Sequence, residues 1–230
     1  MDGAPALNGW LSRAGLALGR LVPGLKALLP KPLLRWLLLN VAKVNAPYAS
    51  FDSLASRRFL QDMLLPWARE HCPHILFVGA APYTHHYERL FTGRHGSFTT
   101  MDVNPSMAVW GSADHIVGPV QEIPRFRPPG SFDCVILNGV FGYGIDSPAE
   151  MRRAVEAIHT VLKPGGLLVV GWNVGLHADP DSLGLYDGLF TPCDASPWQC
   201  RVAFDAETHV YDFRVQSPST PEPYRSTRSR

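Results

Sequence analysis

The sequence predicts an α/β protein built on a mostly parallel β-sheet. Three observations predict this fold class. Short apolar runs alternate with helical or turn-forming segments from residue 75 onward, as parallel strands buried on both faces do. One strand–helix–strand unit has clear start and stop signals. The last two apolar runs flank a short polar turn and indicate an antiparallel pair.

Five runs are the expected parallel strands, and each is four to eight residues long. They read ILFVG (75–79), SFTTMDV (97–103), HIVG (115–118), FDCVILNG (132–139) and GLLVVGW (166–172). The antiparallel pair is CRVAF (200–204) with THVYDFRV (208–215).

The segment between the fourth and fifth strands predicts a helix. Ser147 is a suitable N-cap, Pro148 suits the first helical position, and Glu150 completes a capping box. Lys163, Pro164 and two glycines end the helix and lead into the next strand. Apolar residues repeat on one helical face at Met151, Ala154, Val155, Ile158, Val161 and Leu162.

A second amphipathic helix is expected before the first strand, in FDSLASRRFLQDMLLPWARE (51–70). Its predicted core-facing stripe is Phe59, Leu60, Met63, Leu64 and Trp67.

The chain divides into three regions. Residues 1–46 are rich in leucine, carry six Lys or Arg and one acid, and are cut into short helices by prolines. Two interpretations of this region stay open: the helices cap the core and shield a substrate pocket, or they form a basic amphipathic surface that rests on anionic membrane. Residues 47–216 form the main domain. Residues 217–230 lack apolar content and are expected to be disordered.

Bulk properties exclude several classes of protein. The 230 residues are 46% hydrophobic and 18% charged, which are globular values, and a net charge of +1 argues against a nucleic-acid partner. No signal peptide is evident at the N-terminus. Four cysteines without paired spacing indicate free thiols in a cytoplasmic protein. His71, Cys72 and His74 lack a second ligand cluster, so no metal site is predicted.

The turn after the first strand is the expected ligand site. Open α/β folds bind ligands where parallel strands end, and Gly79 permits a tight turn there. A dinucleotide fingerprint needs three glycines, but the positions read Gly79, Ala81 and Thr84. Pro82 adds bulk where a pyrophosphate would lie. A nucleoside ligand without phosphates fits better, which favours adenosylmethionine over NAD.

Asp102 closes the second strand, 23 residues after Gly79. A carboxylate at this place accepts hydrogen bonds from both hydroxyls of a ribose. The alternative is a plain helix or turn cap.

The order VGAAP, MDVNP, VGPVQEIP, SFDCVILNGV and LKPGGLLVVGW resembles the class I S-adenosylmethionine-dependent methyltransferases, in particular the type 11/12 domain, over about residues 55–215. This resemblance implies a Rossmann-like sheet of seven strands with an antiparallel last strand. It also implies cofactor contacts for ten residues: Gly79, Ala80, Ala81, Asp102, Val103, Val120, Gln121, Asn138, Gly139 and Val140.

Three positions depart from the family pattern. Phe77 replaces the usual acid of the first strand, Tyr83 replaces the last glycine of the loop, and Pro119 replaces an acid that faces the adenine. Each departure removes a polar cofactor contact. Gln121 is the expected substitute at the adenine.

The function implied is methyl transfer from S-adenosylmethionine to oxygen or nitrogen of a small biosynthetic or lipid-like molecule. His85 and His177 are the candidate bases, because they follow the first and fifth strands. The insertion 177–199 is a candidate lid. The alternatives are a non-catalytic binding protein that kept the fold and an NAD-dependent oxidoreductase.

Overall fold

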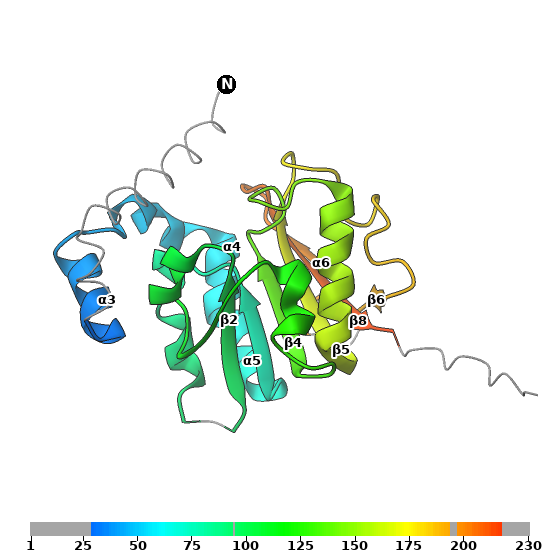
Figure 1. Cartoon of the computed structure of the whole chain (residues 1–230). Helices are drawn as coiled ribbons and strands as arrows, with labels where there is room; N and C mark the ends of the chain where they lie inside the picture. The colour runs from blue at the N-terminus through cyan, green and yellow to red at the C-terminus, as the bar shows by residue number, and fades with distance from the viewer. Residues whose placement is uncertain (1–28, 94, 194–196, 218–230) are drawn as a thin grey trace, which may run out of the picture.

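The computed structural model describes residues 29–93, 95–193 and 197–217, which form a central sheet with helices on both faces (Figure 1). The strands are β1 (His74–Val78), β2 (Ser97–Asp102), β3 (Asp114–Val117), β4 (Phe132–Asn138), β5 (Leu162–Asn173), β6 (Phe190–Pro192), β7 (Arg201–Ala203) and β8 (His209–Gln216). The α-helices are α3 (Lys31–Asn40), α4 (Ala55–Arg58), α5 (Leu65–His71) and α6 (Pro148–Val161).

The sheet order confirms the predicted fold class. The strands run β3-β2-β1-β4-β5-β8-β6, with β1 to β5 parallel and β8 antiparallel to β5. The sheet has eight strands where seven were expected, because the short β7 pairs with β8 as the expected hairpin while β6 pairs further along the same strand.

Alternate side chains of the strands enter two separate cores. On β4, Val135 and Leu137 enter the core beneath α6, whereas Cys134 and Ile136 enter the core beneath α5 and the helical segment 59–64. Both sets are 0–1% exposed, so the sheet is buried on both faces. The near-continuous apolar strands of the sequence therefore reflect this two-sided burial.

Helix α6 confirms the predicted strand–helix–strand unit. Ser147 Oγ accepts from the Glu150 backbone N–H, and the Glu150 carboxylate accepts from the Ser147 backbone N–H and hydroxyl. Pro148 occupies the first turn. All six residues of the predicted apolar stripe are buried.

The predicted stripe of the earlier helix is wrong at one position. Phe59, Leu60 and Leu64 are buried, but Met63 is 50% exposed. The reason is a π-helical segment, η2 (Phe59–Leu64), between α4 and α5. A π-turn is wider than an α-turn, so Met63 rotates away from the face that 3.6-residue spacing assigns to it, while Leu64 stays buried.

Short 3₁₀ segments, and not an α-helix, follow β1. These are η3 (Pro82–Thr84) and η4 (Tyr87–Phe91), and β2 and β3 are likewise followed by η5 (Pro105–Val109) and η6 (Val120–Arg125). At η3 the Thr84 hydroxyl donates to the Ala81 carbonyl and accepts from the Ala81 N–H, both at 3.0 Å, which closes the turn locally. The turn after β1 therefore does not open an α-helix in the described chain.

The described part of the N-terminal region packs against the domain. From α3, the Arg35 guanidinium donates to the carbonyls of Val109 and Gly111, and Lys31 donates to the Ser112 carbonyl at 2.6 Å. Leu38 and Trp110 form a small buried cluster beside these bonds. Residues 1–28 and the tail 218–230 lie outside the described residues.

None of the described helices is long and apolar enough to span a bilayer. None of the four cysteines forms a disulfide within the described residues, and Cys72, Cys134 and Cys193 are buried.

Candidate functional site

A cavity of about 670 Å³ opens at the carboxyl ends of β1, β2, β4 and β5. Its size suits a small-molecule ligand. Seven of the ten predicted cofactor residues line it: Gly79, Ala80, Ala81, Asp102, Val103, Asn138 and Gly139. The structure therefore brings together residues from three separate strand ends, as the parallel topology requires.

Gly79 allows the backbone of the first turn to approach β4. Its φ is +101°, in the left-handed region, and a Cβ at this position would lie 2.4 Å from the Asn138 carbonyl oxygen. No other residue type fits both constraints.

Replacing Gly79 by alanine is expected to lower the free energy of unfolding by roughly 2–3 kcal/mol, through backbone strain plus this clash. Gly130→Ala is the matched control, because its φ is +69° but a Cβ there meets nothing within 4 Å. Urea unfolding of both variants checks the difference. Equal losses of unfolding free energy in the two variants would show that the close approach to Asn138 does not add to the destabilisation.

Asp102 lies at the cavity wall, partly buried. Its Oδ1 accepts from the Asn104 N–H at 2.8 Å. Burial raises the pKa of this carboxyl, and the N–H groups of Asn104 and Ala80 act in the opposite direction. A carboxylate that is partly removed from water, with further acceptor capacity toward a cavity, suits a ligand that carries hydroxyl donors.

Val120, Gln121 and Val140 do not line the cavity. Val120 is 4% exposed and packs in the core with α6, because η6 begins at this residue and turns its side chain inward. Val140 also packs against that core. The structure thus gives Gln121 no place at the cavity wall.

A polar array lines the cavity beside Asn138, and its central member, His209, was not predicted from the sequence. The His209 ring nitrogens lie 3.1 Å from Asn138 Oδ1 and 3.2 Å from Asn173 Oδ1, and the Asn173 amide nitrogen donates to the Tyr143 hydroxyl at 3.2 Å. The array exists because β8 pairs with β5, which sets Asn173 directly opposite His209. That register is the signal that could have revealed it.

His209 is neutral at physiological pH. Burial and the nearby Arg57 lower its pKa to about 4, against the weaker effect of Glu207. A neutral ring donates from one nitrogen only, so one of its two asparagine partners must turn its amide nitrogen toward the ring. With both nitrogens engaged, His209 holds Asn138 and Asn173 in place and is a positioning residue.

Histidine burial predicts acid sensitivity of the fold. The pKa values of His209 and His115 are both about 4, lowered first by burial, whereas an unfolded histidine has about 6.5. Between these values the unfolded chain binds more protons, so stability is full above about pH 6.5 and falls as the pH drops toward 4.

For His209 the slope is at most about 1.4 kcal/mol per pH unit. Urea unfolding of wild type and His209→Gln from pH 7.5 to 4 should show a shallower slope for the variant. Identical slopes would contradict the burial of a neutral ring.

The two predicted bases lie outside the cavity lining. His85 Nδ1 bonds the Pro82 carbonyl at 2.7 Å within the η3 turn, which holds the ring beside Trp110. His177 Nδ1 bonds the Ala178 carbonyl at 2.7 Å, and its ring packs against Trp172. Local backbone bonds therefore fix both rings away from the site.

An aromatic wall closes one side of the cavity. Tyr48 and Phe51 come from η1 (Ala46–Ser53), and their ring centroids lie 4.9 and 5.3 Å from the ring of Tyr83. Tyr83, the substitute for the last loop glycine, is thus part of the pocket. Phe77 is 1% exposed in the core, so this departure leaves no group at the site.

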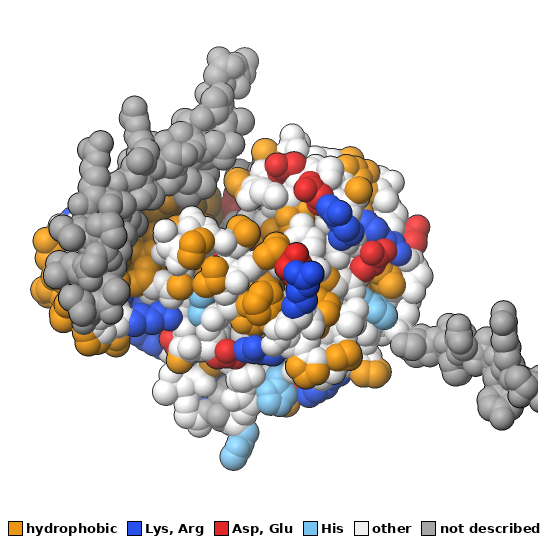
Figure 2. Space-filling view, viewed as in Figure 1, with side chains coloured by type: hydrophobic (Ala, Val, Ile, Leu, Met, Phe, Trp, Pro, Cys, Tyr) orange, Lys and Arg blue, Asp and Glu red, His pale blue; other side chains and the backbone are white. Residues whose placement is uncertain are grey.

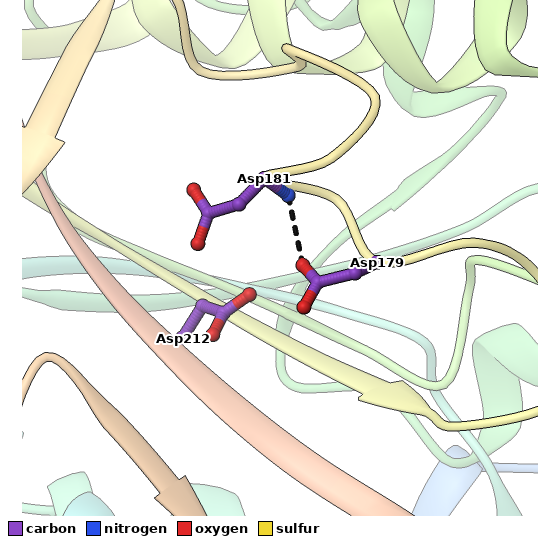
Figure 3. Close-up of side chains that lie close together, drawn as sticks. All are labelled: Asp179, Asp181 and Asp212. Carbon is purple, nitrogen blue, oxygen red and sulfur yellow. Dashed lines mark hydrogen bonds between the residues drawn. The ribbon is translucent and has the colours of Figure 1, made fainter.

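None of the described residues of the insertion 177–199 lines the cavity. Asp179 and Asp181 from this insertion lie beside Asp212 of β8 (Figure 3). Arg201 donates to all three carboxylates, including 2.9 Å to Asp179 and 3.1 Å to Asp212, and Arg214 adds a bond to Asp181. Two guanidinium groups therefore neutralise this acidic cluster, and their bonds connect the insertion to the sheet.

Comparison with known families identifies the domain. A family model described as a methyltransferase domain matches residues 78–170. Residues 78–170 are therefore similar to a methyltransferase domain. The match runs from the end of β1 through most of β5, so it contains Gly79, Asp102 and Asn138. The resemblance stated from the sequence motifs is confirmed.

Curated relatives match part of this domain. The ubiquinone/menaquinone biosynthesis C-methyltransferase UbiE of Pasteurella multocida is 28% identical over 103 residues, which are 40% of this chain and 36% of that protein. Its counterpart in Escherichia fergusonii is 26% identical, over 40% of this chain and 38% of that protein. The chain thus spans little more than a third of the length of these relatives.

Solved structures share the fold. The N-methyltransferase NodS from Bradyrhizobium japonicum WM9, in complex with S-adenosyl-L-homocysteine, has a TM-score of 0.56 and 17% identity over 74% of this chain and 91% of that one. The 1,6-didemethyltoxoflavin-N1-methyltransferase of Burkholderia thailandensis has a TM-score of 0.52 and 18% identity over 81% and 88%. At such identities the likeness shows the fold alone.

Proposed function

We propose that the protein is an S-adenosylmethionine-dependent methyltransferase that acts on oxygen or nitrogen of a small molecule. One observation carries this proposal: a single cavity joins the Gly79 turn and Asp102 to a wall of tyrosines and amides. The first part fits the cofactor, and the second offers hydrogen bonds and aromatic surface to an acceptor. The matching family model supports the reaction class.

The described residues fit adenosylmethionine better than NAD. Asp102 offers its carboxylate to ribose hydroxyls, and Val103, 66% exposed at the cavity edge, offers a surface for the adenine. A dinucleotide needs a glycine-rich turn that opens a helix, so that N–H groups meet the pyrophosphate. Here Pro82 and Tyr83 occupy the turn, which continues as a 3₁₀ segment.

The sulfonium of bound adenosylmethionine supplies the transferable methyl group, so the protein must mainly align the acceptor and exclude water. The aromatic wall excludes water from one side. The Tyr143 hydroxyl, held by Asn173 at 3.2 Å, is placed to bind the acceptor's nucleophilic group. His209 supports this placement through Asn173. This array supports small acceptors with polar groups, in keeping with the small-molecule acceptor that the toxoflavin enzyme's name states.

The non-catalytic alternative has one observation in its favour. Phe77 and Pro119 cannot supply the acids that the family pattern places near the cofactor, and Tyr83 adds a side chain where that pattern has a glycine. Gln121 does not line the cavity and so does not replace the lost groups. Weak cofactor binding without turnover would follow from these substitutions.

Parallel calorimetric titrations with adenosylmethionine, adenosylhomocysteine and NAD separate these functions. The proposal expects binding of both adenosyl ligands and none of NAD. NAD binding would favour an oxidoreductase, and the failure of all three would favour the binding protein. Incubation with adenosylmethionine and metabolite extract, followed by mass spectrometry for the gain of one methyl group, then identifies the acceptor.

Peripheral membrane contact through residues 1–46 is a second part of the proposal. On α3, Leu33 and Trp36 are 45% and 55% exposed, and its C-cap residue Val41 is 67% exposed. Figure 2 shows hydrophobic side chains gathered at that edge of the molecule. Because Lys31 and Arg35 bond to the domain, attraction to anionic lipid would depend on other basic residues. The cytoplasmic location, favoured by the free cysteines, belongs to the same proposal.

Co-sedimentation with anionic vesicles tests the membrane contact. Trp36→Gln is expected to reduce the bound fraction, with the exposed Met63→Gln as the control. Equal sedimentation of wild type and Trp36→Gln would remove α3 from the contact and favour its role as a cap.

A further inference from the structure

Arg57 presents a charge to the cavity that no carboxylate of the described chain neutralises. It lies in α4, partly buried, with its guanidinium 4.4 Å from the centre of the Tyr83 ring and its Nη1 donating to the Tyr87 hydroxyl at 2.7 Å. Among the described residues, no Asp or Glu forms an ion pair with it. Burial lowers its pKa, and the phenols of Tyr87 and Tyr83 more than offset this effect.

The other charged residues of the cavity are already accounted for. The Glu207 carboxylate accepts from the Ser56 N–H and hydroxyl at the start of α4. Asp102 is the carboxylate proposed for the ribose, at the end of β2. With His209 neutral, Arg57 is the one cation among the residues that the structure describes in the cavity lining.

An arginine held in this way is preorganised to bind an anion. Stacking on Tyr83 and the bond to Tyr87 fix the plane of the guanidinium, while its remaining N–H groups donate to no other side chain of the described residues. A fixed guanidinium matches a carboxylate through two parallel bonds. A partly desolvated charge gains most from such a partner, because leaving it unpaired is unfavourable.

We propose that Arg57 binds the carboxylate of a ligand in this cavity. The proposal rests on the proposed function for the identity of the ligand. Two sources offer the same chemistry: the amino-acid end of the cofactor, and an acid group on the acceptor. The rings of Tyr48, Phe51 and Tyr83 beside the guanidinium give either ligand an apolar surface next to its charge.

The test compares ligands that differ in the carboxylate. Adenosylhomocysteine has the amino-acid group, and 5′-methylthioadenosine is a related thioether without it. Benzoate and benzamide form the second pair, as small aromatic probes with and without charge. Wild type, Arg57→Gln and Arg57→Lys are titrated with all four. Arg58→Gln is the matched control, since Arg58 is adjacent and exposed, and it does not line the cavity.

If the cofactor is the source, Arg57→Gln weakens the binding of adenosylhomocysteine at least tenfold and changes the affinity for methylthioadenosine by less than twofold. If the acceptor is the source, the affinities for both nucleosides are unchanged. The affinity for benzoate falls at least tenfold, and that for benzamide does not. Arg57→Lys should give a smaller loss, since a lysine keeps the charge without the planar fork, and it serves as the test if the glutamine variant fails to fold.

Equal losses for the charged and uncharged member of each pair would overturn the proposal, because they indicate a structural role. Unchanged binding of both carboxylates would overturn it as well. Failure of the wild type to bind either nucleoside would contradict the proposed function instead, and the benzoate pair would still decide the role of Arg57.

Discussion

Replacing Asp102 by alanine is expected to weaken the binding of adenosylhomocysteine at least a hundredfold. The variant loses the two charge-assisted hydrogen bonds proposed to the ribose hydroxyls, each worth roughly 1.5–3 kcal/mol. The fold should survive, because Asp102 lies at the end of β2, next to the cavity. The substitution removes hydrogen bonds to two backbone N–H groups there, those of Asn104 and Ala80. Calorimetric titration measures the affinity, and thermal unfolding reports on the fold.

Two further variants sharpen this prediction. Asp102→Asn keeps the shape and loses the charge, so an intermediate loss is expected. Asp62→Ala, an exposed acid on η2 outside the cavity lining, should bind like wild type. Wild-type affinity in Asp102→Ala would mean that this carboxylate is a turn cap for Asn104 and nothing more.

The ionisation of Asp102 adds a pH dependence to the same contact. Since burial raises its pKa, protonation should begin at a higher pH than for an ordinary aspartate. The protonated form accepts fewer hydrogen bonds, so affinity should fall as the pH drops toward that raised pKa and be full above it.

The parts of the fold that local sequence determines could be predicted. Helix α6 has its capping box, its proline and its apolar stripe in one stretch, and the structure confirms each of them. Gly79 and Asp102 could be placed together because each follows a parallel strand, and neighbouring parallel strands end at one edge. The exposure of Met63 could not be predicted, because the π-turn that exposes it has no signature in the spacing of apolar residues.

The proposed acceptor side of the site depends on long-range packing. His209 meets Asn138 across 71 residues of chain, and Arg57 meets Tyr83 through the docking of α4 on the first turn. A histidine that follows a parallel strand, such as His177, looks equally suitable until its local backbone bond is known. Sequence position therefore predicts which residues are near the sheet edge, and only the tertiary contacts decide which of them face the cavity.

The second large effect is expected outside the site, at Arg201. Its guanidinium bonds Asp179 and Asp212, and Asp212 is 0% exposed, so removing the arginine leaves a buried carboxylate without its main counter-charge. Hydrogen bonds from Arg201 correspondingly lower the pKa of Asp179. Trp172 and Tyr186 also donate to Asp212, yet neither carries a charge.

Arg201→Leu should therefore lower the free energy of unfolding by about 3 kcal/mol, the low end for a broken buried pair, since the Arg201 side chain is 35% exposed. Arg125→Ala breaks the surface pair with Glu122, where the side chains are 74% and 43% exposed, and should change stability by less than about 0.5 kcal/mol. Urea unfolding measures both. The double variant Arg201→Leu with Asp212→Leu should recover part of the loss, because it removes the stranded charge. If Arg201→Leu were as mild as Arg125→Ala, the insertion would be held by the packing of Leu185 and Phe190 against the core, and the carboxylate cluster would be free to serve another purpose.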